Sequence, residues 1–332
     1  MPHQHLHVCR LVHNTHHQRL MFRHDVMGTA VGFRRRNGKN TGQPVVTIFV
    51  SRKLPSDMVR GASRLPGRLT YGSLEVETDV VEQEAPSVPL AHDAGIAVPT
   101  PTLPDLAIER RPIVGGASIA HWHFPVGTVT AGVVDLIGGR RCVLSCNHVL
   151  ARLNGGHFGD PVLQPAPDDG GWYPREAAAA LLRYVPVHFD GTPNHVDAAI
   201  AACWPGDISN VVEGVGEVHE SVSPDTLLPG DKVMKVGRST GLTHGTVVYV
   251  DAAVKPNYGP LGFSDRSVQF VNQIVADIPA NVGDSGSILV DSRGRAVGML
   301  FGGLPHRSWF NPFTEIERRL GVSLLPRQHV WV

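Results

Sequence analysis

Three short segments of the chain carry residues whose types and setting fit nucleophilic catalysis. The first is the GDSGS segment at residues 283–287, which is followed by the apolar run Ile288–Val290. A serine flanked by glycines on a tight turn before a strand exposes its hydroxyl, and adjacent backbone N–H groups can converge beside it. Ser285 is therefore the candidate nucleophile. Because Gly, Asp and Ser also build ordinary turns, this segment alone does not decide the matter.

Two segments upstream supply a base and an acid. Residues 142–150 (CVLSCNHVL) place His148 at the end of a β-branched and apolar segment, where a rigid strand end can present an imidazole. Residues 194–201 (NHVDAAIA) place Asp197 at the mouth of an apolar strand, where a buried charge needs a hydrogen-bonding partner. His148 is thus the candidate general base and Asp197 the acid that orients it. The chain order His, Asp, Ser is that of the chymotrypsin type and differs from the orders of subtilisin and the α/β-hydrolases.

The three segments together resemble those of the chymotrypsin-like (trypsin-like) serine peptidases, over roughly the last two thirds of the chain. A closer resemblance comes from residues 111–118 (RPIVGGAS), 127–128 (GT) and 235–245 (KVGRSTGLTHG). With the amino-terminal segment, these are similar to the intracellular trypsin-like proteases related to the plant narrow-leaf protease and its bacterial relatives. The resemblance implies a mainly β fold of two antiparallel Greek-key barrels with a C-terminal helix, and an active site in the cleft between the barrels.

The same resemblance implies a role for each candidate residue. His148 and Asp197 would come from the first barrel and Ser285 from the second. His148 would accept the Ser285 proton during attack on a carbonyl and return it to the leaving amine, while Asp197 would hold the imidazole tautomer. The N–H groups of Gly283 and Ser285 would form the oxyanion hole, which contributes about 3 to 4 kcal/mol per donor in comparable sites. This chemistry requires no metal and no organic cofactor.

The resemblance also indicates where a substrate would lie. By its position after the nucleophile, the segment 298–303 (GMLFGG) resembles the strand against which the family pairs the substrate backbone, a form of strand addition. Phe301, Gly302 and Gly303 are therefore expected to line the groove. The position at the base of the primary pocket falls on Pro279, so no acid stands there to select Arg or Lys. We expect a small or apolar residue before the cleaved bond.

Upstream of the peptidase domain, the composition predicts three parts. Residues 1–22 read as a histidine-rich tail or a short helix, 23–82 as a small α+β domain, and 83–111 as a proline-rich linker. Within the small domain we expect strands near 26–33, 44–50 and 74–81, and a hairpin turn at 37–42.

The peptidase domain is expected to span residues 112–332. Short β-rich segments divided by Gly, Pro and Asp predict barrels at about 112–215 and 225–305. Asn311 as N-cap, Pro312 at the first helical position and Gly321 after the last turn predict a closing helix over about 312–320.

The overall composition fits a soluble globular enzyme, because the 332 residues are 42% hydrophobic and formally neutral at pH 7. Neutrality argues against nucleic acid as the main partner, and a protein or peptide substrate is expected instead. No segment approaches the roughly 18 consecutive apolar residues of a membrane helix. The first 25 residues hold seven histidines but no apolar core of a secretory signal, so we expect a cytoplasmic protein. The relatives suggest a homo-oligomer.

Two metal sites are conceivable and both are disfavoured. Cys142, Cys146 and His148 could be zinc ligands, but His148 must be free for proton transfer, and we expect reduced, half-buried thiols. The early histidines could bind a transition metal, but a flexible tail lacks an enforced geometry; these are His3, His5, His7, His13, His16 and His17.

Activation and reaction class also carry alternatives. Residues 111–116 imitate the activation site of trypsin zymogens, in which a new amino terminus pairs with the acid before the nucleophile, here Asp284. An Arg–Pro bond is a poor substrate for such a cut, so we expect a chain that is active uncut. The main hypothesis is a serine endopeptidase. A catalytically silent peptide-binding scaffold and an esterase or acyl transferase of the same fold are the alternatives.

Overall fold

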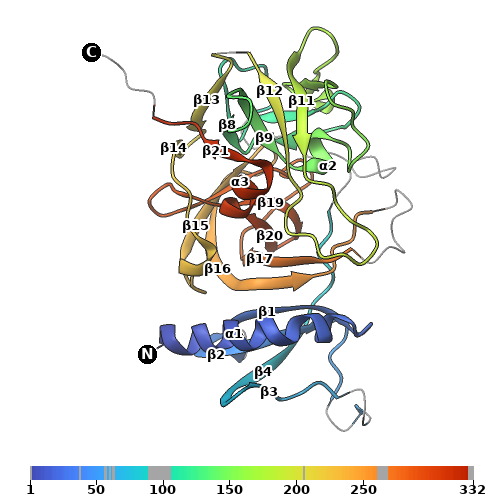
Figure 1. Cartoon of the computed structure of the whole chain (residues 1–332), viewed down its shortest axis with the longest axis vertical. Coiled ribbons are helices and arrows are strands. Elements are labelled where there is room, and N and C mark those ends of the chain that lie inside the picture. The colour runs from blue at the N-terminus through green and yellow to red at the C-terminus, as the bar shows by residue number, and fades with distance from the viewer. Residues whose placement is uncertain are drawn as a thin grey trace.

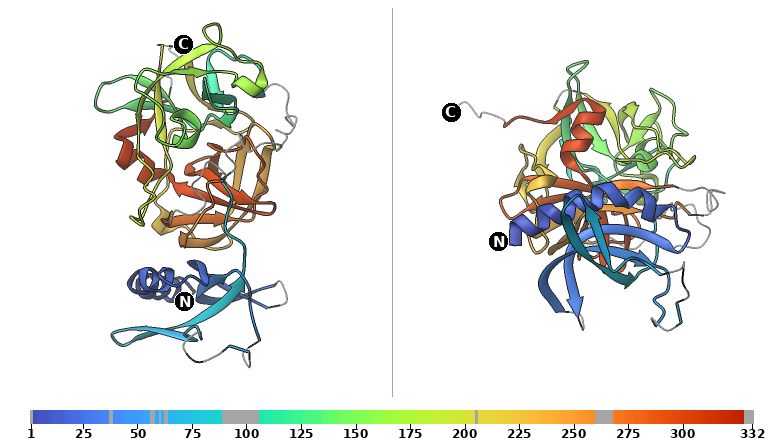
Figure 2. Two further views of the ribbon diagram at one scale, coloured as in Figure 1. Left: turned by 90° about the vertical axis from the view of Figure 1, so that its right-hand side faces the viewer. Right: turned by 60° about the horizontal axis from the view of Figure 1, so that its bottom comes forward.

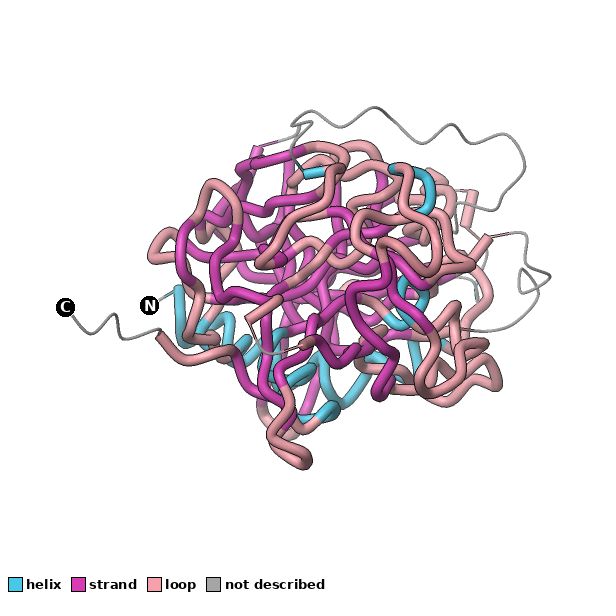
Figure 3. The backbone as a smooth tube through the Cα atoms, turned by 90° about the horizontal axis from the view of Figure 1, so that it is seen from above, coloured by secondary structure: helices cyan, strands magenta, loops and turns pink. Residues whose placement is uncertain are grey.

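The structure is a computed structural model that describes residues 2–36, 39–55, 58–59, 61, 64–88, 106–204, 206–259 and 268–327. Strands dominate it and helices are few (Figure 3). Two mainly antiparallel β units stack on one another, and a smaller unit with a helix lies beneath them (Figure 1). The expected mainly β, chymotrypsin-like double-barrel fold is confirmed.

The first barrel is an eight-stranded sheet in the order β21-β8-β9-β12-β11-β10-β6-β7, with a three-stranded sheet β14-β13-β5 beside it. The strands are β5 (Ile113–Gly115), β6 (Ser118–His121), β7 (Gly127–Thr128), β8 (Ala131–Asp135), β9 (Arg141–Ser145), β10 (Pro161–Leu163), β11 (Ala177–Tyr184), β12 (Ala199–Cys203), β13 (Ile208–Val212), β14 (Gly216–Glu217) and β21 (Val322–Leu324). A short helix, α2 (Asn147–Leu150), follows β9, and two 3₁₀ turns cover Pro167–Asp169 and Pro224–Thr226. Since β21 pairs with β8, this unit also uses chain from beyond the second barrel.

The second barrel is closed, because β15 pairs with both β16 and β18. Its six strands are β15 (Lys232–Gly237), β16 (Gly241–Val254), β17 (Phe270–Ala276), β18 (Ile288–Asp291), β19 (Ala296–Leu304) and β20 (Arg307–Pro312). Helix α3 (Phe313–Leu320) ends at Gly321, whose φ of 64° is the left-handed conformation that glycine adopts at helix ends. The helix buries Phe313, Ile316 and Leu320 against the barrels.

The amino-terminal unit continues the sheet of the second barrel instead of standing apart from it. Its elements are α1 (Pro2–Met21), β1 (Val26–Arg36), β2 (Lys39–Val50), β3 (Arg68–Tyr71) and β4 (Leu74–Glu82). Strand β1 pairs antiparallel with β16, with Gly28 opposite Val254 and Gly32 opposite Tyr249. Ten strands therefore form one sheet, which runs from β15 through β16 and β1 to β3 (Figures 1 and 2).

Of the two structures expected for the histidine-rich residues 1–22, a tail or a short helix, the helix is present, because residues 2–21 form α1, which packs on this unit. Its apolar side chains are buried: Leu6, Cys9, Val12, Leu20 and Met21. Leu6, Cys9 and Val12 are spaced by three, so they share one face of the helix. Numerous histidines between these positions hid that face in the sequence. The hairpin turn expected at 37–42 extends too far, because β2 already begins at Lys39. Residues 37–38 lie outside the described part.

The linker is described at residues 83–88 and 106–111, and most of its prolines lie outside the described residues. All four cysteines carry free thiols, and Cys9, Cys142 and Cys146 are buried. Over the described residues, no helix has both the length and the apolar character needed to cross a membrane.

Candidate active site

His148 and Asp197 meet at one end of the first barrel. The antiparallel pairing of β9 with β12 sets Ser145 opposite Ala199. His148 lies three residues after the end of β9 and Asp197 two residues before the start of β12, so both extend beyond the sheet at the same end. Nδ1 of His148 lies 2.6 Å from Oδ2 of Asp197, and the backbone N–H of His148 donates to Oδ1 at 3.0 Å. Both side chains are completely buried. The carboxylate therefore fixes the imidazole from two directions.

A second residue, which sequence reasoning missed, also donates a hydrogen bond to Asp197. The hydroxyl of Tyr258 donates to Oδ2 of Asp197 at 2.8 Å, and the Tyr258 ring stands edge-on to the His148 ring with centroids 6.3 Å apart. Burial raises the pKa of Asp197. The charge of His148 and the hydrogen bonds from His148 and Tyr258 lower that pKa by more than burial raises it, so the net shift is downward. The Asp197 carboxyl thus stays ionised where it faces the imidazole. Burial and the Asp197 charge raise the pKa of Tyr258 well above its usual range.

Asn311 also serves the site and is not the N-cap of the closing helix. The capping residue is Pro312, while Oδ1 of Asn311 accepts the backbone N–H of Asp197 at 2.9 Å. Nδ2 of Asn311 donates to Oε1 of Gln273 at 2.7 Å. A buried amide pair from β20 and β17 of the second barrel therefore holds the backbone of an acid that the first barrel supplies.

Ser285 lies on the predicted turn before β18, and its backbone is held against the first barrel. Its carbonyl oxygen accepts the Thr128 N–H at 2.8 Å, and Thr128 Oγ1 donates to the carbonyl oxygen of Gly283 at 2.7 Å. Gly286 has a φ of 96°, and a Cβ there would lie 2.1 Å from the Thr128 carbonyl oxygen, so only glycine fits. Among the described residues, the N–H groups of Gly283 and Ser285 have no hydrogen-bond acceptor. They remain available to a developing oxyanion.

His148 and Ser285 share this region without a direct hydrogen bond between them in the described structure. Nε2 of His148 is buried and has no partner among the described residues. The thiol of Cys146, two residues before His148, donates to the carbonyl oxygen of Leu300, which also accepts the N–H of Gly286. One carbonyl oxygen thus ties the segment before His148 to the residue after Ser285.

Ser285 opens into a cavity of 500 Å³, which we call the β19 cavity. Its walls include Ser87, Pro279, Gly302 and Gly303, and it is completed by Thr240, Ala280, Asn281, Val282, Leu300, Leu304 and Pro305. Phe301 was expected to line the groove, but its side chain does not. It is fully buried and stacks on Phe270 with ring centroids 4.8 Å apart. Side chains alternate along a strand, so the residue beside Gly302 turns into the core.

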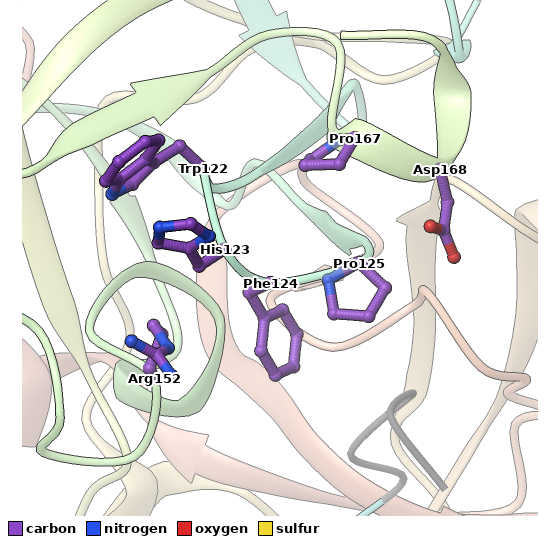
Figure 4. Close-up of a pocket in the computed structure, with 7 residues that line it drawn as sticks. All are labelled: Trp122, His123, Phe124, Pro125, Arg152, Pro167 and Asp168. Atoms are coloured by element: carbon purple, nitrogen blue, oxygen red, sulfur yellow. The ribbon is translucent and has the colours of Figure 1, made fainter. Parts of the chain in front are cut away.

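Figure 4 shows residues that line a second cavity of 590 Å³, which we call the Trp122 cavity. Trp122, His123 and Arg152 gather at one end of it, and Asp168 stands at the other end. Phe124 lines it and has its ring centroid 6.1 Å from that of His148. No sequence motif pointed to this cavity.

Ligand atoms of Cys146, His148 and Asp197 lie within 4.8 Å of one another, which is a spacing that a metal ion could use. Hydrogen bonds already engage all three groups: His148 bonds to Asp197, and the Cys146 thiol donates to a carbonyl oxygen. Burial and the Asp197 charge raise the pKa of Cys146 well above its usual range, so the thiolate that a metal prefers is disfavoured. The donor set fits a hydrogen-bonded base better than a metal centre.

Comparison with known proteins finds two family models that match parts of the chain. Residues 7–81 match the NARROW LEAF 1 N-terminal domain, and residues 183–315 match the Nal1 C-terminal domain. The chain is 27% identical over 308 residues to Protein NARROW LEAF 1 of Oryza sativa subsp. japonica. That alignment covers 85% of this chain and 52% of the rice protein, so the chain spans about half the length of this relative.

Solved structures of serine proteases are also similar to this chain, at lower sequence identity. Thermobifida fusca Protease A is 17% identical, with a TM-score of 0.47, 65% of this chain covered and 99% of that chain. A glutamic acid specific serine protease is 18% identical, also with a TM-score of 0.47, and the coverage is 64% of this chain and 100% of that one. Identities of 17% and 18% with TM-scores of 0.47 carry no information about the activity of this chain. The chain thus matches the models of the NARROW LEAF 1 N-terminal domain and the Nal1 C-terminal domain, is similar to Protein NARROW LEAF 1, and has a chymotrypsin-like double β-barrel.

Proposed function

We propose that the chain is a serine endopeptidase that cleaves protein or peptide substrates through His148, Asp197 and Ser285. The observation that carries this proposal is the buried His148–Asp197 pair at 2.6 Å, whose imidazole keeps Nε2 without a partner among the described residues. An imidazole held by a carboxylate at one nitrogen and open at the other is the arrangement that a general base requires. Ser285 supplies the hydroxyl on the neighbouring loop.

In the proposed reaction, Nε2 of His148 takes the proton of the Ser285 hydroxyl as Oγ attacks the substrate carbonyl carbon. The N–H groups of Gly283 and Ser285 stabilise the oxyanion of the tetrahedral intermediate. His148 then gives the proton to the leaving amine, and an acyl-enzyme remains on Ser285. Water, deprotonated by His148, hydrolyses the acyl-enzyme. Asp197 keeps the Nδ1 proton in place and stabilises the imidazolium in both halves of the reaction.

The lining of the β19 cavity supports a proposal about the residue that precedes the cleaved bond. Among the described residues that line it, none carries a charge, and its apolar contributions come from Pro279, Ala280, Val282, Leu300 and Leu304. An unpaired Arg, Lys, Asp or Glu side chain would lose its hydration there without gaining an opposite charge. We therefore propose a small or apolar residue at this position.

A peptide-binding scaffold without catalytic activity is the second candidate. It is favoured by the absence of a hydrogen bond from the Ser285 hydroxyl to His148 among the described residues. An esterase or acyl transferase would use the same nucleophile and base, and would be separated from a peptidase by its inability to cleave amide substrates.

The test is covalent labelling of the purified full-length chain with an alkyl fluorophosphonate, read by intact mass. The proposal expects one label on the wild type, none on Ser285→Ala, and a rate lower by several orders of magnitude for His148→Ala. Ser323→Ala on β21 is the matched control and should label like the wild type. No label on the wild type would favour the scaffold. Label without any hydrolysis of peptide amides would favour the esterase.

A further inference from the structure

The linker segment Pro86–Val88 lies along the edge of β19, where Ser87 forms an isolated β-bridge with Gly303. The N–H of Ser87 donates to the carbonyl oxygen of Gly303 at 3.1 Å, and the N–H of Gly303 donates back to the Ser87 carbonyl oxygen at 2.9 Å. This reciprocal exchange is an antiparallel bridge. We call Pro86–Val88 the strap.

The other edge of the strap is also paired. The N–H of Val88 donates to the carbonyl oxygen of Asn257 at 2.8 Å, and the N–H of Asn257 donates to the carbonyl oxygen of Pro86 at 2.8 Å. The strap therefore lies between β19 and Asn257 with four backbone hydrogen bonds.

Side-chain packing also holds the strap in place. Val88 is fully buried and Pro86 is buried, whereas the Ser87 side chain faces solvent. A Cβ on Gly302 would lie 3.0 Å from the Ser87 carbonyl oxygen and 3.1 Å from Cγ2 of Val88, so the strap lies directly over this glycine. The glycine at 302 is thus explained by a backbone that approaches it closely, and the strap is that backbone.

The strap occupies the place that a peptide paired with Gly303 would take beside the cavity of Ser285. Ser87 lines the β19 cavity together with Ser285, Gly302 and Gly303. A peptide that adds to the edge of β19 would use the N–H and the carbonyl oxygen of Gly303. Ser87 already holds both of these groups, so the strap and such a peptide exclude one another.

We propose that the strap is a built-in ligand of the peptide groove, which blocks the groove until it is displaced and shows which peptides fit. The displacing peptide pairs with Gly303 and places an aliphatic β-branched side chain in the buried position of Val88. The inhibitory meaning of this exchange rests on the proposed endopeptidase function, but the binding itself does not.

The strap is also tied to the amino-terminal unit, which supplies a route for its release. Gln83, directly after β4, donates its N–H to the carbonyl oxygen of Val50 on β2, and its side chain accepts a hydrogen bond from Arg307 of β20. Gln83 lies only three positions before Pro86, so a partner that moves β4 would also pull on the strap.

The test measures binding of a fluorescent peptide with the sequence of residues 84–88 (EAPSV) by anisotropy. All proteins carry Ser285→Ala, so that no turnover occurs. Ser87→Pro removes the N–H that reaches Gly303, and Val88→Asp puts a carboxylate at a buried position. Ser87→Ala is the matched control, because it keeps both backbone hydrogen bonds. Two opening variants at different positions keep the test valid if one of them fails to fold.

We expect the peptide to bind Ser87→Pro and Val88→Asp about tenfold more tightly than Ser87→Ala or the unaltered strap, since each lost hydrogen bond shifts an equilibrium by about two- to tenfold. A peptide with Asp in place of Val should not bind. Equal binding to all four proteins would overturn the proposal. So would no binding to either folded opening variant at about 1 mM, the effective concentration of a tethered segment.

Labelling by the small fluorophosphonate separates this proposal from the function of the site. The probe reaches Ser285 without using Gly303, so it reports the nucleophile whatever the strap does. Binding that depends on the strap, together with no labelling, would keep the strap and reject the endopeptidase. Labelling together with binding that ignores the strap would keep the endopeptidase and reject the strap.

Discussion

Nζ of Lys235 lies 3.2 Å from Oδ2 of Asp284, and both side chains are completely buried. The same carboxylate accepts the hydroxyl of Thr240 at 2.7 Å and the backbone N–H groups of Ser239 and Asn281 at 2.9 and 3.0 Å. Burial lowers the pKa of Lys235, and the Asp284 charge opposes that shift without cancelling it. Since Asp284 directly precedes Ser285, this network fixes the loop that carries the proposed nucleophile and the N–H group of Gly283.

Replacing the cation should therefore damage both the fold and the site. Lys235→Met leaves the Asp284 carboxylate buried without an opposite charge, and removing one partner of a buried pair typically costs about 3 to 5 kcal/mol. We expect a loss of that size in urea unfolding at pH 7, together with a large drop in fluorophosphonate labelling. Lys232→Met is the control, because Lys232 lies exposed on the same strand. A loss below about 1 kcal/mol at Lys235 would show that the pair does not hold this loop.

The same pair predicts that the chain works without being cut. Trypsin-like activation supplies a new amino terminus to neutralise the acid before the nucleophile, and here Lys235 already stands beside Asp284. Ile113, the first residue after the Arg111-Pro112 pair, is buried, and its N–H donates to the carbonyl oxygen of Asp207 at 2.7 Å. We expect the labelled protein to have the intact mass of the full chain. Label confined to a fragment that begins at Pro112 or Ile113 would contradict this.

Local patterns carried enough information to predict much of the site. His148, Asp197 and Ser285 each stand in a short motif at the end of a strand, and antiparallel pairing of β9 with β12 is sufficient to bring the first two together. Tyr258 and Asn311 could not be found in this way. They reach Asp197 from the second barrel, and their contacts exist only after both barrels have packed.

Sequence patterns did not predict the pairings in which one segment bonds to two neighbouring segments. The glycine-spaced apolar pattern of residues 26–33 and the β-branched residues of 44–50 predicted strands. They did not predict the pairing of β1 with β16, which joins the amino-terminal unit to the barrel. The proline content of residues 83–111 predicted a linker, yet Ser87 pairs with Gly303 as a strand does. Such pairings depend on which sheet edge is left open, and a single segment's periodicity does not contain that information.

Tyr258 should act as a positioning residue for the Asp197–His148 pair. Tyr258→Phe keeps the ring beside His148 but removes the hydrogen bond to Asp197, and hydrogen bonds to charged groups contribute about 1.5 to 3 kcal/mol. We expect a drop of about tenfold or more in the labelling rate and in kcat for a peptide substrate, with KM unchanged. Tyr184→Phe in the first barrel is the control. An unchanged kcat, or a rise in KM alone, would assign Tyr258 to packing or to substrate binding instead.

The amino-terminal helix should lose stability in mild acid because of His13. This side chain is buried, its Nε2 lies 2.9 Å from the hydroxyl of Thr29, and its ring stacks on that of His17 with centroids 5.4 Å apart. Burial, assisted by the nearby charge of His17, lowers the pKa of His13 to about 3. The unfolded chain therefore binds a proton near pH 6.5, whereas the folded chain does not until far lower pH.

The sign of the effect follows from this difference. Because the unfolded state binds more protons between the two pKa values, the stabilising contribution is complete above about pH 6.5 and falls as the pH is lowered, by about 2 kcal/mol at pH 5. Urea unfolding at pH 7 and pH 5, followed by far-UV circular dichroism, should show this loss in the wild type. His13→Gln, which cannot titrate, should show less of it, while His5→Gln on the exposed side of the same helix should behave like the wild type. Equal losses in His13→Gln and the wild type would mean that another group causes the acid sensitivity.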